Sequence, residues 1–220
     1  AFIVLGRLLN KSNDIKAGSY EVAEAITPLA LLNKLARGEF AMGQITFVEG
    51  WNFRQIRAAL DSHPALRHDT RGLSVPEILG RLDAPEKHPE GLFFPDTYFF
   101  SAGTSDLVIL RQAYTKMQQR LTALWPQRAK GLPIHSPYEA LVLASIVEKE
   151  TGVRDEREMV AAVFVNRLKR GMRLQADPTV IYGLGERFDG NLRRRDLLTD
   201  QPYNTYTRTG LPPTPVAMPG

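Results

Sequence analysis

The 220-residue chain contains no cysteine. A disulfide framework and a cysteine-ligated metal site are therefore excluded. Its four histidines also lack the i, i+3 or i, i+4 spacing of helical metal ligands, and no His-Glu-x-x-His motif is present. No Gly-x-Gly-x-x-Gly motif follows a predicted strand, which argues against a dinucleotide site. The sequence thus predicts neither a catalytic metal nor a cofactor.

The chain also lacks a long apolar run, since none approaches the roughly 18–20 residues that cross a bilayer. The apolar stretch Ala1–Leu9 is too short, and no signal-peptide cleavage pattern follows it. The sequence begins without Met and ends in the loop-like Pro219-Gly220. We therefore expect the chain to be part of a longer protein, in which any membrane anchor lies outside these residues.

Charge of one sign is only mildly in excess, with a formal net charge of +4. This balance is compatible with an anionic polymer as a partner without requiring one. The basic runs Arg167–Arg170 and Arg193–Arg195 are more typical of solvated faces, and no nucleic-acid-binding motif accompanies them. We therefore predict no nucleic-acid partner.

Hydrophobic periodicity predicts a mixture of strands and helices. Strands are expected over Ile15–Val22 and Gln44–Val48, with a short helix over Leu29–Arg37 between them. A proline-rich junction over 63–89 follows this β-α-β unit. Further helices are predicted over 52–62, 75–82, 106–124, 136–151 and 154–170.

Beyond residue 172 the pattern changes to loops and short strands. The predicted fold class is therefore α+β. A small β-α-β subdomain with its preceding segment and junction occupies residues 1–88, and a mainly helical domain with loops and short strands occupies residues 89–220. Polar residues and tyrosines interleave on the last loops, which suits a cleft for hydroxyl-rich ligands.

The predicted helix over 136–151 carries an acid on its apolar side. Ser136 is a favourable N-cap, and Leu143, Ile146, Val147 and Glu150 share one face at i, i+3, i+4 and i+7. A carboxylate held against apolar neighbours loses hydration, which favours its protonated form. A carboxylic acid that keeps its proton near neutral pH can act as a general acid, so Glu150 is the candidate.

Other readings of the acids stay open at this point. Glu150 would have no catalytic role if it were only the solvated end of a buried helix or paired with an arginine. Glu148 lies two residues away and points about 200° around the helix, so the two acids cannot serve one pocket equally. Asp96 and Asp177 are expected in capping or Asx-turn roles, although glycoside hydrolysis usually needs a second carboxylate.

Five segments, read in order, closely resemble the YceG-like endolytic murein transglycosylase family (MltG). The segments are Glu90–Tyr98, Ala144–Thr151, Val163–Leu168, Met172–Gly183 and Tyr203–Tyr206 with Gly210–Pro213. The resemblance covers about residues 15–220. It also implies that the amino-terminal β-α-β unit is LysM-like.

The resemblance implies a bacterial inner-membrane protein with one amino-terminal anchor and its enzymatic part in the periplasm. It implies a lyase that cleaves nascent glycan strands between N-acetylmuramic acid and N-acetylglucosamine without water, leaving 1,6-anhydro ends. The expected partners are peptidoglycan glycan strands and the synthases that make them.

The resemblance places the catalytic glutamate in the Glu-Lys-Glu segment. We assign it to Glu150, with Glu148 in reserve, because Ile-Val-Glu-Lys-Glu-Thr aligns best with the Glu-Ser step of other lytic transglycosylases. The residues expected to contact sugar are Gln175, Asn204 and Tyr206 through hydrogen bonds, and Tyr203 or Tyr182 through stacking.

Two other functions fit the sequence. A muramidase would use water, with Asp177 or Asp96 as its second carboxylate. A non-catalytic peptidoglycan-binding module would bind glycan through the LysM-like unit and leave the Glu150 cleft inert.

Overall fold

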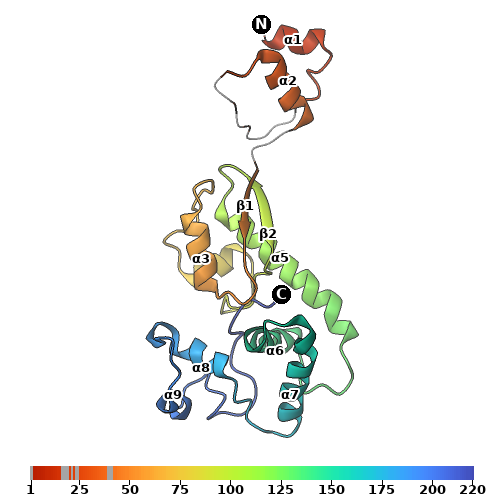
Figure 1. The fold of residues 1–220 in the computed structure, drawn as a ribbon. Helices are drawn as coiled ribbons and strands as arrows, with labels where there is room; N and C mark the ends of the chain where they lie inside the picture. The colour runs from red at the N-terminus through yellow and green to blue at the C-terminus, as the bar shows by residue number, and fades with distance from the viewer. Residues whose placement is uncertain (1, 16–19, 21, 23–24, 39–41) are drawn as a thin grey trace.

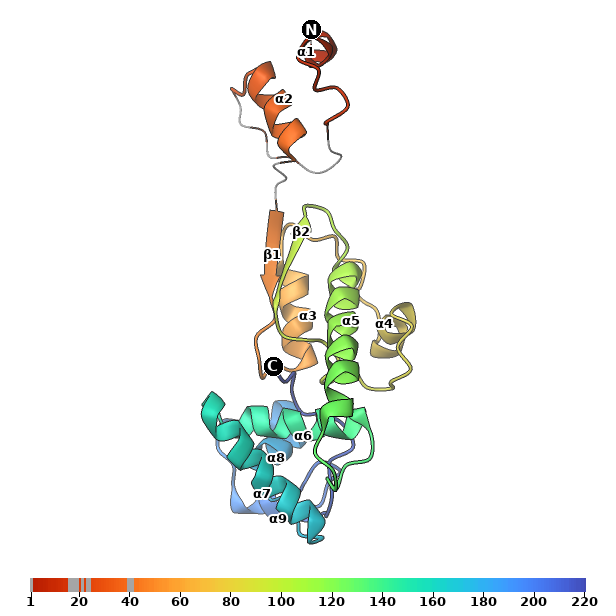
Figure 2. The same cartoon turned by 90° about the vertical axis from the view of Figure 1, so that its right-hand side faces the viewer.

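The structure is a computed structural model that describes residues 2–15, 20, 22, 25–38 and 42–220. At its amino-terminal end, helices α1 (Phe2–Leu8) and α2 (Pro28–Arg37) pack on each other, apart from the rest of the chain (Figures 1 and 2). The predicted strand over Ile15–Val22 falls mostly outside the described residues. In the part of the chain that is described, no helix has the length and apolarity needed to cross a membrane.

The remaining elements confirm the α+β class and, apart from β2, which was not predicted, lie close to the predicted bounds up to residue 170. They are β1 (Met42–Thr46), α3 (Phe53–Ser62), α4 (Val75–Arg81), β2 (Thr97–Ser101), α5 (Asp106–Leu124), α6 (Pro137–Glu150), α7 (Arg157–Lys169), α8 (Asp177–Leu184) and α9 (Arg194–Leu198). Short 3-10 turns occupy 125–127, 154–156 and 185–187.

Below α1 and α2, the molecule has two halves (Figure 1). The upper half, which contains α3, α4 and α5, is built on a two-stranded antiparallel sheet. Strand β1 pairs with β2 in a register that runs from Met42 opposite Ser101 to Thr46 opposite Thr97. Helices α3 and α5 lie beside this sheet (Figure 2). The main hydrophobic cluster contains buried side chains from both sides of residue 88, among them Ile56 and Phe93. The predicted division into residues 1–88 and 89–220, and the LysM-like character of the first part, stay predictions.

The lower half contains α6, α7, α8 and α9, and in it α6 packs against α7 and α8. Its cluster of buried side chains joins the apolar face of α6 to α7 and to the segments before and after α8; its members are Leu143, Ile146, Val147, Phe164, Leu174, Ala176 and Val216. The prediction of loops and short strands beyond 172 was wrong for residues 177–184 and 194–198, which form α8 and α9. The β-branched Val180 and Ile181 suggested a strand, but Pro178 begins a helix well and burial of Thr179 and Val180 outweighs strand propensity.

The last residues of the chain run between the two halves (Figure 1). The amide of Val216 donates to Ser145 Oγ of α6 at 2.9 Å. The amide of Met218 donates to the Trp51 carbonyl at 2.7 Å, and Met218 O accepts from Gly50 N at 2.8 Å. Met218 is fully buried in the upper cluster. This segment therefore connects α6 below to the turn before α3 above.

Gly91 permits the close approach of this segment. It has a left-handed φ of 78°, and a Cβ at this position would lie 2.5 Å from Pro215 Cβ. Both the backbone conformation and the contact with Pro215 therefore exclude a larger residue.

We expect Gly91→Ala to lower the free energy of unfolding by roughly 2–5 kcal/mol, because it adds an overpacked contact to left-handed strain. Gly103→Ala is the matched control, since Gly103 has a φ of 81° but open space around its Cβ position. It should cost only about 1–2 kcal/mol. Urea unfolding of both variants measures the difference, and equal losses would contradict the proposed contact.

Candidate active site

Glu150 lies at the carboxyl end of α6, and local sequence explains why the helix runs to this point. Ser136 Oγ accepts the Glu139 amide at 3.1 Å, and Pro137 occupies the first helical position. The Glu139 carboxylate accepts a hydrogen bond from the His135 backbone amide at 2.6 Å. The helix then extends from this capped start until Thr151, whose extended backbone ends it.

The carboxyl group of Glu150 is exposed at the end of the buried face of α6. Within the described residues, no hydrogen bond or ion pair engages this carboxyl group. Partial desolvation raises its pKa above the ordinary value, and the negative charge of Asp177 raises it further. Glu150 is therefore a solvent-accessible acid that holds its proton more firmly than a typical glutamate.

Glu148, and not Glu150, is the acid that the structure buries, which reverses the expectation from helical spacing. Its side chain is only 8% exposed and pairs with Arg157 at 3.0 Å. Its second oxygen accepts the Gly220 amide at 3.2 Å. Arg157 also contacts Glu49 at 3.2 Å. These contacts suit a structural link between α6, α7 and the end of the chain.

Asp177 and Tyr206 lie within electrostatic reach of Glu150. Asp177 is the first residue of α8, and the Tyr206 hydroxyl donates to its Oδ1 at 2.5 Å. Desolvation raises the pKa of Tyr206 to about 12, with further contributions from Asp177 and Glu150. The structure thus brings together the proposed acid, a second carboxylate and a tyrosine hydroxyl that stays protonated at neutral pH.

Gln175 lies at the same edge, two residues before Asp177. Arg167 of α7 donates to Gln175 Oε1 at 3.0 Å and to the Leu174 carbonyl at 2.7 Å. The backbone amide of Gln175 donates to the backbone carbonyl of Thr205 at 3.0 Å, which joins this segment to the loop that carries Tyr206. Gln175 is exposed and has a left-handed φ of 54°. Its side chain is therefore accessible to a ligand near Asp177 and Tyr206.

Asn204, which the sequence suggested as a sugar contact, is fully buried. Its side-chain nitrogen donates to the carbonyls of Asp196, Leu197 and Thr199, and its Oδ1 accepts the Tyr206 amide at 2.9 Å. This geometry does not support direct contact with sugar. The side chain instead holds the loop that presents Tyr206.

Tyr182 and Tyr203 line a separate pocket of about 650 Å³ between α3 and α8. Their rings meet edge to face with centroids 4.9 Å apart. Lys149 and Pro178, the sequence neighbours of Glu150 and Asp177, also line this pocket. The pocket therefore lies next to the acidic cluster, although the two tyrosines themselves face Glu90 and Thr214 through their hydroxyl groups.

Glu90 in this pocket was not among the predicted site residues. It is 3% exposed and accepts the Phe53 amide at 2.9 Å and the Tyr182 hydroxyl at 3.0 Å. Desolvation raises its pKa to about 7, because the two hydrogen bonds only partly offset the loss of water. Its position within the Glu90–Tyr98 segment of the family resemblance was the only sequence signal for it.

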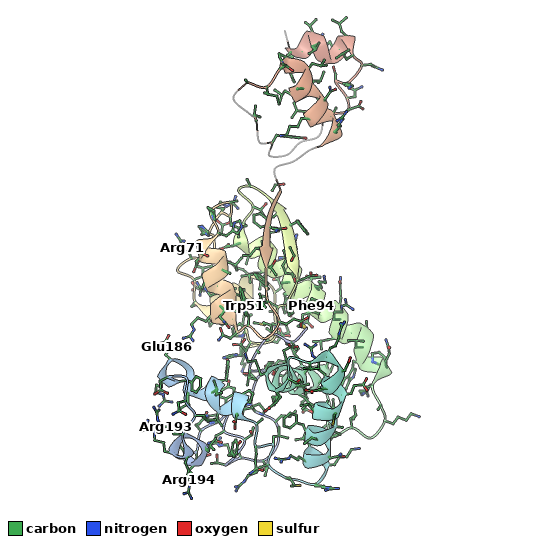
Figure 3. All side chains as sticks on the ribbon, in the orientation of Figure 1. Trp51, Arg71, Phe94, Glu186, Arg193 and Arg194 are labelled. Atoms are coloured by element: carbon green, nitrogen blue, oxygen red, sulfur yellow. The ribbon has the colours of Figure 1, made fainter. Side chains whose placement is uncertain are left out.

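The pocket is bordered by an ion pair that joins the two halves of the molecule. Arg54 of α3 donates to Glu186 at 2.8 Å. Figure 3 shows Glu186 at the end of the turn after α8, on the side that faces α3. Both side chains are largely exposed, so the pair contributes little to stability.

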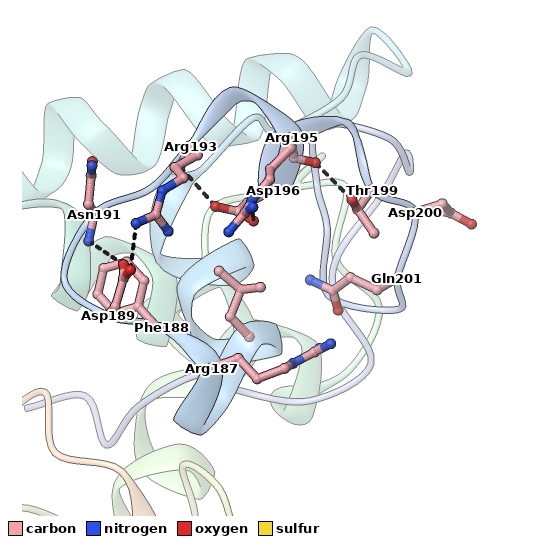
Figure 4. Close-up of a pocket in the computed structure, with 11 residues that line it drawn as sticks. Arg187, Phe188, Asp189, Asn191, Arg193, Arg195, Asp196, Thr199, Asp200 and Gln201 are labelled. Atoms are coloured by element: carbon pink, nitrogen blue, oxygen red, sulfur yellow. Dashed lines mark hydrogen bonds and ion pairs between the residues drawn. The ribbon is translucent and has the colours of Figure 1, made fainter.

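A further pocket of about 430 Å³ lies beside α9 (Figure 4). Two of its basic residues have acidic partners, with Arg193 on Asp189 at 2.5 Å and Arg195 on Asp196 at 3.6 Å. The Arg193–Arg195 run is thus partly neutralised within the fold.

Asp96, the other candidate second carboxylate, accepts the Thr97 amide and pairs with Lys116, which lowers its pKa. The capping or Asx-turn role expected for Asp96 stays a prediction.

A sequence model of the YceG-like family matches residues 1–220. The chain belongs to the YceG-like family. It is 32% identical over 233 residues to an endolytic murein transglycosylase of Bacillus subtilis (strain 168), an alignment that covers 95% of this chain and 62% of that protein. It is 27% identical to an endolytic murein transglycosylase of Streptococcus pneumoniae, with 94% of this chain and 43% of that protein covered.

A crystal structure of a YceG-like protein from Listeria monocytogenes has a similar fold. The TM-score is 0.66 at 29% sequence identity, and the alignment covers 100% of this chain and 77% of that one. The present chain spans less than two thirds of the length of the Bacillus subtilis and Streptococcus pneumoniae relatives.

Glu90 gives the YceG-like chain a pH-dependent stability. Its pKa of about 7 in the folded state lies above the ordinary 4.5, so between these values the unfolded chain releases a proton that the folded chain retains. The free energy of unfolding should therefore fall by about 3 kcal/mol as pH rises from 4.5 to 7. Glu90→Gln should lack this slope, and the exposed Glu158→Gln should keep it. Parallel urea titrations across this range test the expectation, which fails if Glu90→Gln follows the wild type.

Asp177 should influence the titration of Glu150. Asp177→Asn removes a like charge, so the pKa of Glu150 should move down toward its ordinary value. Carbon-detected NMR titration of the Glu150 carboxyl measures this change. Asp189→Asn, on the remote loop shown in Figure 4, is the control and should leave the Glu150 curve in place. An unchanged Glu150 curve in Asp177→Asn would show that the two carboxyl groups are not coupled.

Proposed function

We propose that this chain is the catalytic part of an endolytic murein transglycosylase, with Glu150 as its single acid and base. The observation that carries the proposal is the environment of Glu150. It is an accessible acid with a raised pKa at the end of a buried helix face, beside Asp177 and Tyr206. The names of the Bacillus subtilis and Streptococcus pneumoniae relatives support the same reaction.

The proposed reaction begins with protonated Glu150. Its proton passes to the glycosidic oxygen between N-acetylmuramic acid and N-acetylglucosamine as the bond from C1 to that oxygen breaks. The Glu150 carboxylate then accepts the proton of the muramic acid 6-hydroxyl, whose oxygen attacks C1. A 1,6-anhydro ring and a free 4-hydroxyl result, and Glu150 regains its proton. Neither water nor a protein nucleophile enters the balance.

Residues around Glu150 have supporting roles in this proposal. The negative charge of Asp177 helps Glu150 to keep its proton before cleavage and favours positive charge at C1 in the transition state. Tyr206 and Gln175 offer hydrogen-bonding groups to the sugar. Tyr182 and Tyr203 line the adjacent pocket, where their rings are available for stacking.

Asp177 also keeps a second function open. An acid with a second carboxylate near it is the arrangement that hydrolytic glycosidases use, and the charge of Asp177 raises the pKa of Glu150. In a muramidase, Asp177 would act as the second carboxylate and water would attack C1. The products separate the two reactions, because hydrolysis leaves a reducing end and cyclisation does not.

The cellular setting belongs to the proposal as well. Peptidoglycan glycan strands are the proposed substrate, which places the enzymatic part outside the inner membrane, in the periplasm. A single amino-terminal membrane anchor, a LysM-like subdomain and contact with peptidoglycan synthases remain predictions from the family resemblance.

Digestion of purified sacculi tests the assignment of Glu150. We expect the wild-type chain to release anhydro-muropeptides, and Glu150→Gln to reduce their release at least about 100-fold, because an amide cannot donate the proton. Mass spectrometry of the soluble products distinguishes anhydro ends from hydrolytic products, which are heavier by one water. Reducing ends that depend on Glu150 would establish the muramidase instead.

Glu148→Gln is the matched control for this experiment. A glutamine at 148 keeps one acceptor oxygen for Arg157 and loses the second acceptor and the negative charge, which lowers stability but removes no group of the proposed reaction, so activity should stay within about 10-fold of the wild type. The assignment is wrong by two residues if Glu148→Gln abolishes product while Glu150→Gln retains it. Sacculus binding without products from a folded wild-type chain would instead favour a binding module.

A further inference from the structure

Three potential metal ligands meet in the upper half, away from the Glu150 cleft. Asp61 comes from the end of α3, His68 from the following loop and Asp106 from the start of α5. One ligand atom of each lies within 4.8 Å of the others. Asp106 is fully buried, and Asp61 and His68 are half-buried. We refer to these three residues as the Asp61 cluster.

The charges of the Asp61 cluster are poorly balanced by protein groups. Asp106 accepts hydrogen bonds from Thr70 N at 3.1 Å and from Thr70 Oγ1 at 2.6 Å, both of which are neutral donors. Among the described residues, no cation lies within ion-pair distance of Asp106. A buried carboxylate of this kind is normally paired with a cation or bound to a metal.

Neighbouring arginines supply only part of this balance. Arg67 directs its guanidinium to Asp69 at 2.8 Å. Arg71 approaches the Asp61 carboxylate only to 3.9 Å, and its main hydrogen bond goes to the Asp61 carbonyl at 2.6 Å. Figure 3 shows Arg71 on the outer side of α3. The cluster itself therefore keeps an excess of negative charge.

His68 provides an independent indication of a ligand. Its Nδ1 atom is buried and has no hydrogen-bond partner among the described residues. A buried ring nitrogen without a partner is costly, and coordination to a metal ion satisfies it. Metal binding would require the half-buried side chains of Asp61 and His68 to rotate, so that the ligand atoms approach one another more closely than 4.8 Å.

We infer that Asp61, His68 and Asp106 bind a divalent transition-metal ion, with Zn²⁺ as the expected ion. An imidazole nitrogen with two carboxylate oxygens is a donor set that suits Zn²⁺ or Mn²⁺ better than Mg²⁺ or Ca²⁺, which prefer oxygen ligands alone. The ion is structural, because the cluster belongs to the upper half and contains no residue of the proposed catalytic site. It joins the end of α3 and the loop that follows it to the start of α5.

Thermal unfolding of the metal-free chain tests the inference. Saturating Zn²⁺ should raise the Tm of the wild type by roughly 5 °C, and metal analysis should find one ion per chain. Asp61→Asn and His68→Gln should lose this shift. Asp83→Asn, which alters an exposed carboxylate elsewhere, should keep it. No shift, an equal shift in all four proteins, or a shift with Mg²⁺ or Ca²⁺ only would overturn the inference.

A second measurement uses the unaltered chain and does not depend on the folding of variants. Mn²⁺ is paramagnetic and broadens the NMR signals of side chains close to it. Low Mn²⁺ concentrations should broaden the imidazole signals of His68 before those of His63, His88 and His135. Broadening of another histidine first, or uniform broadening, would place the ion elsewhere.

Discussion

Burial of the segment Val216–Met218 between the two halves is the interaction on which the arrangement of this molecule depends. Its amides bond upward to the Trp51 carbonyl and downward to Ser145 of α6, while the Met218 side chain fills the upper cluster. Because α6 carries Glu150, this segment fixes the proposed acid relative to α3. The pocket of Glu90, Tyr182 and Tyr203 exists only because the two halves are held at this spacing.

Local signals were sufficient to predict most helices, including the one that ends at Glu150. Helix α6 was predictable because its N-cap and the periodic spacing of its apolar residues can both be recognised in one continuous stretch of sequence. Helix α8 was not, because its run of β-branched residues favours a strand until the packing of Thr179 and Val180 is known. The helical period separated Glu148 from Glu150 but predicted the wrong one on the buried side, since the Glu148 side chain is 8% exposed and Glu150 is exposed. Their chemical roles stay proposals.

Features that depend on distant contacts could not be predicted. Glu90 is buried by partners 37 and 92 residues away, so nothing in its neighbouring sequence indicates a raised pKa. Asn204 looked like a polar loop residue, yet its amide organises three carbonyls inside the loop. The Asp61 cluster likewise forms only when α3 and α5 pack together, because its members follow no metal-binding spacing in the sequence.

Gln175 adds a different consequence. A glutamine with a φ of 54° is in a conformation that glycine or asparagine adopts at lower cost, so the fold gives up about 1 kcal/mol of stability at this position. A strained backbone conformation of this kind is retained where the side chain contributes to function rather than to stability. Efforts to make this protein more heat-resistant would select glycine here, and the segment beside Asp177 is where stability and activity would then come into conflict.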